Sequence, residues 1–153
     1  MKLFLVILLT MLLLGCAKGR VDILSKEGEL LGSCTAEFNW HWHGVQDSVD
    51  YILYLCAKGH LENGKVISDP TILENDYGLP SPPNGQTWNK RSAYESYKSG
   101  HLSEQKYGYI LAAIEYEYIL SAEKARKQLD SGVITKKQYE QLVYEAAVLF
   151  NGK

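Results

Sequence analysis

The first hydrophobic pattern along the chain is an uninterrupted run from Leu3 to Leu14, preceded by Lys2 and followed by Gly15. A run of this length is too short to cross a bilayer as a helix. With one basic residue before it and a small residue after it, the run fits the core of a signal peptide. We therefore predict that residues 1–15 are a signal peptide and that the chain is exported.

The second pattern is an alternation of apolar and polar residues. Residues 21–24 form a short apolar strand candidate, and Ser25-Lys26-Glu27-Gly28 has the composition of a turn. From residue 30 the even positions are apolar or small and the odd positions are mostly polar. A period of two indicates a strand with one buried and one exposed face, which we expect to run from Leu30 to Trp42.

Residues 47–59 predict a helix, with Asp47 as its N-cap and Gly59 as a left-handed end. The segment 49–54 is also rich in strand-forming residues, so a strand stays open as an alternative. If the segment is a helix, Cys56 lies on its apolar face, and Cys34 lies on the apolar face of the preceding strand. Two packed elements would then bring both cysteines together.

A less regular region follows. Asn63-Gly64 predicts a tight turn, residues 65–68 a short strand, and Asp69-Pro70 the start of a brief helical turn. Residues 75–86 contain several glycines and prolines and predict an extended linker. We accordingly divide the chain into a small α+β domain over residues 21–74 and a helical module over residues 87–153.

The helical module contains an internal repeat. Tyr-Lys-Ser-Gly-His-Leu-Ser-Glu-Gln-Lys-Tyr at 97–107 aligns with Leu-Asp-Ser-Gly-Val-Ile-Thr-Lys-Lys-Gln-Tyr at 129–139. In each copy a glycine ends one helix, a hydroxyl residue caps the next, and an apolar residue before the cap packs on a tyrosine. The second copy uses Gly132, Ile134, Thr135 and Tyr139. Two such turns predict three helices, at 88–99, 103–130 and 135–150, with Thr87 capping the first.

The middle helix is longer than the partners predicted for it. Its apolar seam steps alternately by four and three residues and comprises Tyr107, Leu111, Ile114, Tyr118, Ala122, Ala125 and Leu129. At about 1.5 Å per residue the helix would be about 42 Å long. We therefore expect part of its apolar surface to remain for the N-terminal domain or for another molecule.

Composition and charge narrow the function classes. The net charge of −2 and the absence of a basic cluster argue against nucleic acid as a partner. Of the three cysteines, Cys34 and Cys56 form an even pair in an exported chain, which predicts a disulfide between them. The predicted fold class is α+β, a small disulfide-bridged strand and helix domain followed by a three-helix module.

Leu13-Leu14-Gly15-Cys16 resembles the lipobox of bacterial lipoproteins. The resemblance implies that Cys16 is diacylated on sulfur, becomes the new N-terminus and anchors the chain in the lipid bilayer. Residues 16–20 would then be a flexible, lipidated tether. The family uses an aspartate after the cysteine for inner-membrane retention, and Ala17 stands there, so the resemblance implies the outer membrane in a Gram-negative host.

Residues 125–147, with Leu129 to Tyr139 at their centre, resemble the SHOCT domain, a short helical hairpin at the C-termini of many bacterial proteins. The resemblance implies a module for interaction or oligomerisation without catalytic residues. The helices are also rich in tyrosine, which is enriched in binding interfaces. Tyr109 and Tyr116 lie off the apolar seam. Our candidate interaction residues are these two tyrosines together with the residues of the second turn, Gly132, Ile134, Thr135 and Tyr139.

One further constellation lies in the predicted strand. His41 and His43, two residues apart, would project to the same side and offer two metal ligands, with His60 or Glu37 as nominal third ligands. We favour the alternative that the pair is part of a solvent-facing polar edge. Phe38, Trp40 and Trp42 would either form a stacking platform for a glycan or belong to the hydrophobic core. We favour the hydrophobic core.

The sequence lacks a nucleophile elbow, a metalloprotease motif and a phosphate-binding loop. We therefore expect no cofactor and a non-catalytic envelope lipoprotein, an adaptor or assembly component that binds another envelope protein or itself. The alternative is a periplasmic cell-wall-active or metal-handling enzyme that uses the strand from Trp40 to His43.

Overall fold

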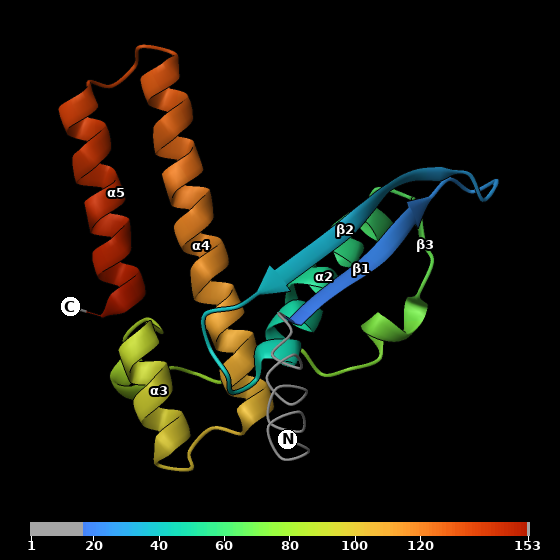
Figure 1. Cartoon of the computed structure of the whole chain (residues 1–153), viewed down its shortest axis with the longest axis horizontal. Coiled ribbons are helices and arrows are strands. Elements are labelled where there is room, and N and C mark those ends of the chain that lie inside the picture. The colour runs from blue at the N-terminus through green and yellow to red at the C-terminus, as the bar shows by residue number, and fades with distance from the viewer. Residues whose placement is uncertain (1–16, 153) are drawn as a thin grey trace, which may run out of the picture.

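The structure, a computed structural model, describes residues 17–152 and has an α+β fold. The predicted signal peptide and the predicted acylation site, Cys16, lie outside the described residues. The elements in chain order are β1 (Ala17–Leu24), β2 (Leu30–Phe38), α2 (Val45–Glu62), β3 (Val66–Ile67), two 3₁₀ turns (Pro70–Leu73 and Pro83–Gly85), α3 (Lys90–Lys98), α4 (Glu104–Asp130) and α5 (Lys136–Asn151). A small sheet lies on α2, and the long helix α4 links this part to α3 and α5 (Figure 1).

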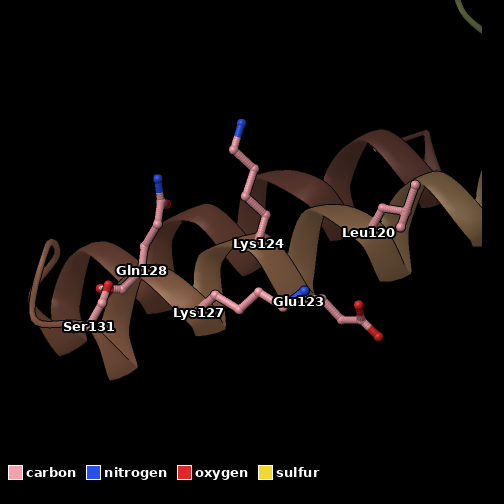
Figure 2. Close-up of a pocket in the computed structure, with 6 residues that line it drawn as sticks. All are labelled: Leu120, Glu123, Lys124, Lys127, Gln128 and Ser131. Atoms are coloured by element: carbon pink, nitrogen blue, oxygen red, sulfur yellow. Dashed lines mark hydrogen bonds between the residues drawn. The ribbon is translucent and has the colours of Figure 1, made fainter.

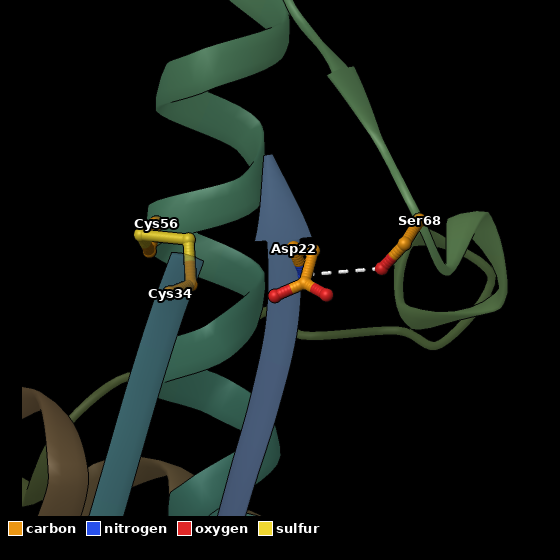
Figure 3. Close-up of a disulfide and its surroundings, with 4 residues drawn as sticks. All are labelled: Asp22, Cys34, Cys56 and Ser68. Carbon is orange, nitrogen blue, oxygen red and sulfur yellow. Dashed lines mark hydrogen bonds between the residues drawn. A yellow bond between two sulfur atoms is a disulfide. The ribbon is translucent and has the colours of Figure 1, made fainter. Parts of the chain in front are cut away.

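The sheet is antiparallel with the order β2-β1-β3, and one face packs on α2. The predicted disulfide is confirmed and joins β2 to α2, with a Cα–Cα distance of 5.9 Å between Cys34 and Cys56 (Figure 3). On the other side of the sheet, the backbone N–H of Asp22 donates to the Ser68 hydroxyl at 3.0 Å and ties β1 to the segment after β3 (Figure 3). The disulfide and this hydrogen bond fasten the sheet to its helix and to the following segment.

The prediction of a flexible tether is wrong for residues 17–20, which are the first half of β1. Ala17 pairs with Phe38, and each following residue pairs in register up to Ile23. The inward positions begin with Ala17 and Gly19, and a Cβ at Gly19 would lie 2.6 Å from the Leu53 side chain in α2. A small residue is therefore needed where β1 crosses the helix. Small residues are also typical of a flexible tether, so the sequence alone does not distinguish a tether from a closely packed strand.

β2 ends at Phe38 and not at Trp42 as predicted. The buried face of the strand holds Cys34 and Phe38, whereas Trp42 is 79% exposed. Residues 39–44 form a loop in which Trp40 leaves the sheet and bonds Glu115 of α4. The alternation of apolar and polar residues continues past the end of the strand, because Trp40 and Trp42 of the loop occupy even positions. The prediction therefore placed the end of the strand too late.

α2 settles the choice between helix and strand in favour of a helix. It begins after Gly44, which has φ of 65° and no side-chain cap, so the predicted Asp47 cap is wrong. Gly59 lies inside the helix, and the first glycine with positive φ after the helix end is Gly64, at 73°. The close approach of α4 fixes Gly44, since a Cβ there would lie 2.6 Å from the Glu104 carbonyl oxygen.

The repeated turn is present in both copies with matching hydrogen bonds. Gly100 and Gly132 have φ of 78° and 71°, and each donates its N–H to the carbonyl three residues before it. Ser103 caps α4, and Thr135 caps α5 in a capping box with Gln138. α3 is capped by Asn89, two residues after the predicted Thr87, because Asn89 and Ser92 form a capping box.

α4 contributes Tyr109 and Ala112 to the core beneath the sheet, and its other buried face forms a second core with α3. Residues 75–86 also pack on the first core, so they are a packed connection and not a free linker. Tyr77, within this segment, is buried and stacks on Tyr54 with ring centroids 4.1 Å apart. Tyr109 of α4 packs on Tyr77 at 5.0 Å and on Tyr51 at 5.5 Å. Proline and glycine content predicts the absence of regular structure, but it does not predict the absence of contacts.

Candidate interaction surface

The second half of α4 and all of α5 form a helical hairpin that projects away from the sheet (Figure 1). Residues 107–112 of α4 are buried, whereas further along the helix only Ala125 is buried, and no residue described in α5 is buried. We define the hairpin surface by the large apolar side chains that it exposes, which are Tyr116, Ile119, Leu120, Val133, Leu142, Tyr144 and Leu149. A smaller share of the apolar side chains is buried in the hairpin than in the sheet and α2. Exposed apolar side chains of this kind favour a surface that binds another molecule.

The structure separates the candidate interaction residues. Tyr109 is 1% exposed, so its assignment to an interaction surface is wrong. It lies off the seam with α5 because α2 packs on another face of α4. Burial raises the pKa of Tyr109 to about 12. Tyr116, one turn beyond the buried half of α4, is exposed.

The other four candidate residues lie together at the far end of the hairpin (Figure 1). Gly132 is exposed and has open space around its Cα, so only its positive φ constrains the residue type. Ile134 and Tyr139 are half-buried on either side of the Thr135 cap. These residues determine the angle at which α5 returns along α4 and act on the surface indirectly.

A groove of about 460 Å³ lies where the hairpin meets the segment 79–88. Its lining is mainly apolar and includes Trp88, Tyr118, Leu149 and Phe150, with Glu117 and Ser121 as polar groups. A concave apolar surface with few polar groups is the usual form of a binding site. The sequence did not reveal it, because its residues come from three separated segments.

Two contacts fix the groove walls. The Trp88 indole N–H donates to the Pro80 carbonyl oxygen at 2.8 Å, and the rings of Tyr118 and Phe150 lie 5.4 Å apart. Phe150 also meets Trp40 edge-on at 6.0 Å. The groove is therefore a formed feature of the fold.

A second, polar depression of about 490 Å³ lies on α4 near the end of the hairpin. Figure 2 shows its lining side chains projecting from α4 and from the residue that follows it: Leu120, Glu123, Lys124, Lys127, Gln128 and Ser131. Three of the six lining side chains are charged and two more are polar, so the depression is solvated. We assign it the role of a polar border to the hairpin surface.

The loop 39–44 supports the base of the hairpin. The Trp40 indole N–H donates to the Glu115 carboxylate at 2.6 Å, and the Lys90 ammonium lies 4.1 Å from the centroid of the Trp40 ring. Partial burial raises the pKa of Glu115, although the Trp40 hydrogen bond and Lys90 act in the opposite direction. Neither Glu115 nor Lys90 was among the residues that the sequence singled out, because their partners lie far away in the chain.

His41 and His43 do not face the same side, because β2 has ended before them. The Nε2 of His41 lies 3.2 Å from the Ser48 hydroxyl, and the Nδ1 of His43 lies 3.2 Å from the Tyr97 hydroxyl. Burial is the main reason that the pKa of His41 is lowered. The Nδ1 of His41 also lies 3.0 Å from the His43 carbonyl oxygen, so the two residues are linked through the backbone while their rings contact different side chains.

Within residues 17–152, one group of three potential metal ligands lies close together, and it consists of Cys34, Cys56 and His60. The two sulfurs are bonded to each other, which leaves His60 as the single free donor. Ser48 and His41 resemble a nucleophile and base only in their separation. Ser48 is fully buried and donates to the Gly108 carbonyl oxygen at 2.7 Å, so no substrate reaches its hydroxyl.

In the described part of the chain, no helix combines the length and the hydropathy that crossing a bilayer requires. No family model, curated protein or solved structure matches the chain.

Proposed function

We propose that this chain is a bacterial envelope lipoprotein held in the membrane by acylated Cys16, and that it acts by non-catalytic binding. The anchor rests on the apolar run and on Leu13-Leu14-Gly15-Cys16. Several acyl chains, at about 0.8 kcal/mol per buried methylene, make release from a bilayer negligible. Replacing Cys16 by serine should release the protein, and its persistence in membranes after a high-salt wash would contradict the anchor.

The helical hairpin is the proposed binding element. The observation that carries this proposal is its exposed apolar surface, which adjoins the groove lined by Trp88, Tyr118, Leu149 and Phe150. A groove along two helices suits the apolar face of a third helix, contributed by another envelope protein or by a second copy. The protein would thus serve as an adaptor or assembly component.

The test disrupts the hairpin without touching the sheet. Gly132→Val places a branched side chain at positive φ, and Thr135→Ala removes the α5 cap, at a cost of about 1 kcal/mol each. The matched control is Gly28→Val, which makes the same change at a φ of 88° in the turn between β1 and β2. Crosslinked assemblies from cells at equal expression should be lost in the hairpin variant and kept in the control.

Unchanged assembly, together with circular dichroism showing loss of α5, would refute the hairpin as the binding element. The alternative of a cell-wall-active or metal-handling enzyme gains no support from the geometry. Trp40 is half-buried against Glu115, and the rings of His41 and His43 contact different side chains, those of Ser48 and Tyr97.

A further inference from the structure

The chain offers no slack between the proposed anchor and the folded body. The first described residue, Ala17, is already in β1, pairs with Phe38 and packs partly buried against the core. A single peptide bond separates it from Cys16. The end of the sheet at which β1 begins must therefore lie next to whatever holds Cys16.

Trp42 lies at that same end. β2 finishes at Phe38, and the loop 39–44 leaves the sheet beside the start of β1 (Figure 1). Trp42 is four residues after Phe38, so their Cα atoms are at most about 14 Å apart, and paired Cα atoms lie about 5 Å apart. The Cα of Trp42 is consequently within about 20 Å of the Cα of Ala17.

The indole of Trp42 is presented to solvent by a loop whose other aromatic groups are held. At 79% it is the most exposed of the large apolar side chains in residues 17–152. Its neighbours are fixed by the bond from Trp40 to Glu115, by the contact of His41 with Ser48 and by that of His43 with Tyr97. Trp42 thus stands out from an ordered loop.

We propose that Trp42 enters the headgroup region of the bilayer and sets the orientation of the protein on the membrane, an inference that rests on the proposed acylation of Cys16. Tryptophan favours this region because its ring is apolar and its N–H is polar. An indole already held beside the lipid surface by a covalent anchor loses little additional freedom when it inserts.

Charge contributes little to this contact. Lys18 stands opposite Glu37 in the sheet register, and Arg20 is paired with Asp22 at 2.7 Å. The contact is therefore apolar and insensitive to salt and to anionic lipid. In this orientation α4, with 27 residues at about 1.5 Å each, carries the turn 131–135 away from the membrane by up to about 40 Å (Figure 1).

The test uses the lipidated full-length protein in vesicles of phosphatidylethanolamine and phosphatidylglycerol that carry bromine on the upper acyl carbons. Bromine quenches an inserted indole. We expect quenching of part of the emission from the three tryptophans, loss of this component in Trp42→Phe and its retention in the control Trp88→Phe. The quenching should also persist in high salt, and its loss there would overturn an apolar contact.

Two further measurements separate this inference from the anchor. A flexible insertion between Cys16 and Ala17 should keep the protein floating with the vesicles while it reduces the quenching, and an unchanged signal would refute the role of the short connection. If the protein floats with the vesicles but bromine quenches the emission of the wild type and of Trp42→Phe equally, the insertion of Trp42 is refuted and the anchor is not. Lipidated protein that fails to float overturns the anchor and the inference together.

Discussion

Gly108 is the position at which α4 crosses the beginning of α2, and Gly108→Ala tests whether the two parts of the chain share a core. A Cβ at this position would meet the Gly44 carbonyl oxygen and lie 2.8 Å from the Cβ of Asp47. Carbon atoms normally approach to about 3.5–4.0 Å. Both contacts are with atoms that cannot rotate away, so the helices would have to separate.

The expected effect follows from three contributions. Overpacking of this kind costs about 1–3 kcal/mol, and separating the helices also weakens the hydrogen bond from Ser48 to the Gly108 carbonyl, worth about 1 kcal/mol. Alanine favours the helix over glycine by about 1 kcal/mol. Gly108→Ala should therefore lower the free energy of unfolding by about 1–3 kcal/mol.

Gly59→Ala is the matched control, because Gly59 lies inside α2 with no atom within 4 Å of the added Cβ. This change should leave stability unchanged or raise it by up to about 1 kcal/mol. Urea denaturation of the unlipidated Cys16→Ser protein, followed by circular dichroism, gives both values. Equal midpoints for the two alanine variants would show that α2 and α4 do not cross closely and would refute the shared core.

Three further predictions concern the disulfide and the loop 39–44. Replacing Cys34 and Cys56 by alanine opens a loop with a sequence separation of 22 and should lower the free energy of unfolding by about 3 kcal/mol. Reductant should destabilise the wild type similarly, and identical urea midpoints with and without it would contradict the bridge. Trp40→Phe removes the donor to Glu115 and should cost about 1–3 kcal/mol, so an unchanged melting temperature would exclude that hydrogen bond. The pKa of His41 is lowered by burial, so the unfolded chain binds more protons, and stability should fall as the pH drops below the ordinary value of 6.5. His41→Gln should flatten this dependence between about pH 7 and pH 5, and equal slopes would assign it to another group.

The sequence predicted the features that depend on short-range chemistry. Gly132 and Thr135 form a turn whose glycine and cap are both set by neighbours within a few residues, and the structure confirms them. The disulfide between Cys34 and Cys56 was predicted from two apolar faces and from an even pair of cysteines in a chain predicted to be exported, and the structure confirms it. The boundaries of α4 were also close to the predicted ones.

The features that were missed depend on contacts between distant segments. Position 19 in β1 requires a glycine because the Leu53 side chain occupies the space where a Cβ would lie. No residue near position 19 in the sequence indicates this contact. Tyr109 is core because α4 has partners on two faces. To predict the groove, one must know how three distant segments are placed in space. The hydrogen bond from Trp40 to Glu115 likewise joins residues that lie 75 positions apart in the chain. A single sequence contains no record of such proximity.

The most direct test of the proposed function is photo-crosslinking in living cells. A photoreactive amino acid is placed at Leu149, in the groove of the hairpin, or at Leu30, at the distal end of the sheet, which have similar exposed fractions of 69% and 61%. The proposal predicts a discrete crosslinked protein from Leu149 and none from Leu30. The absence of a product at Leu149, or the same products from both positions, would contradict binding through the hairpin.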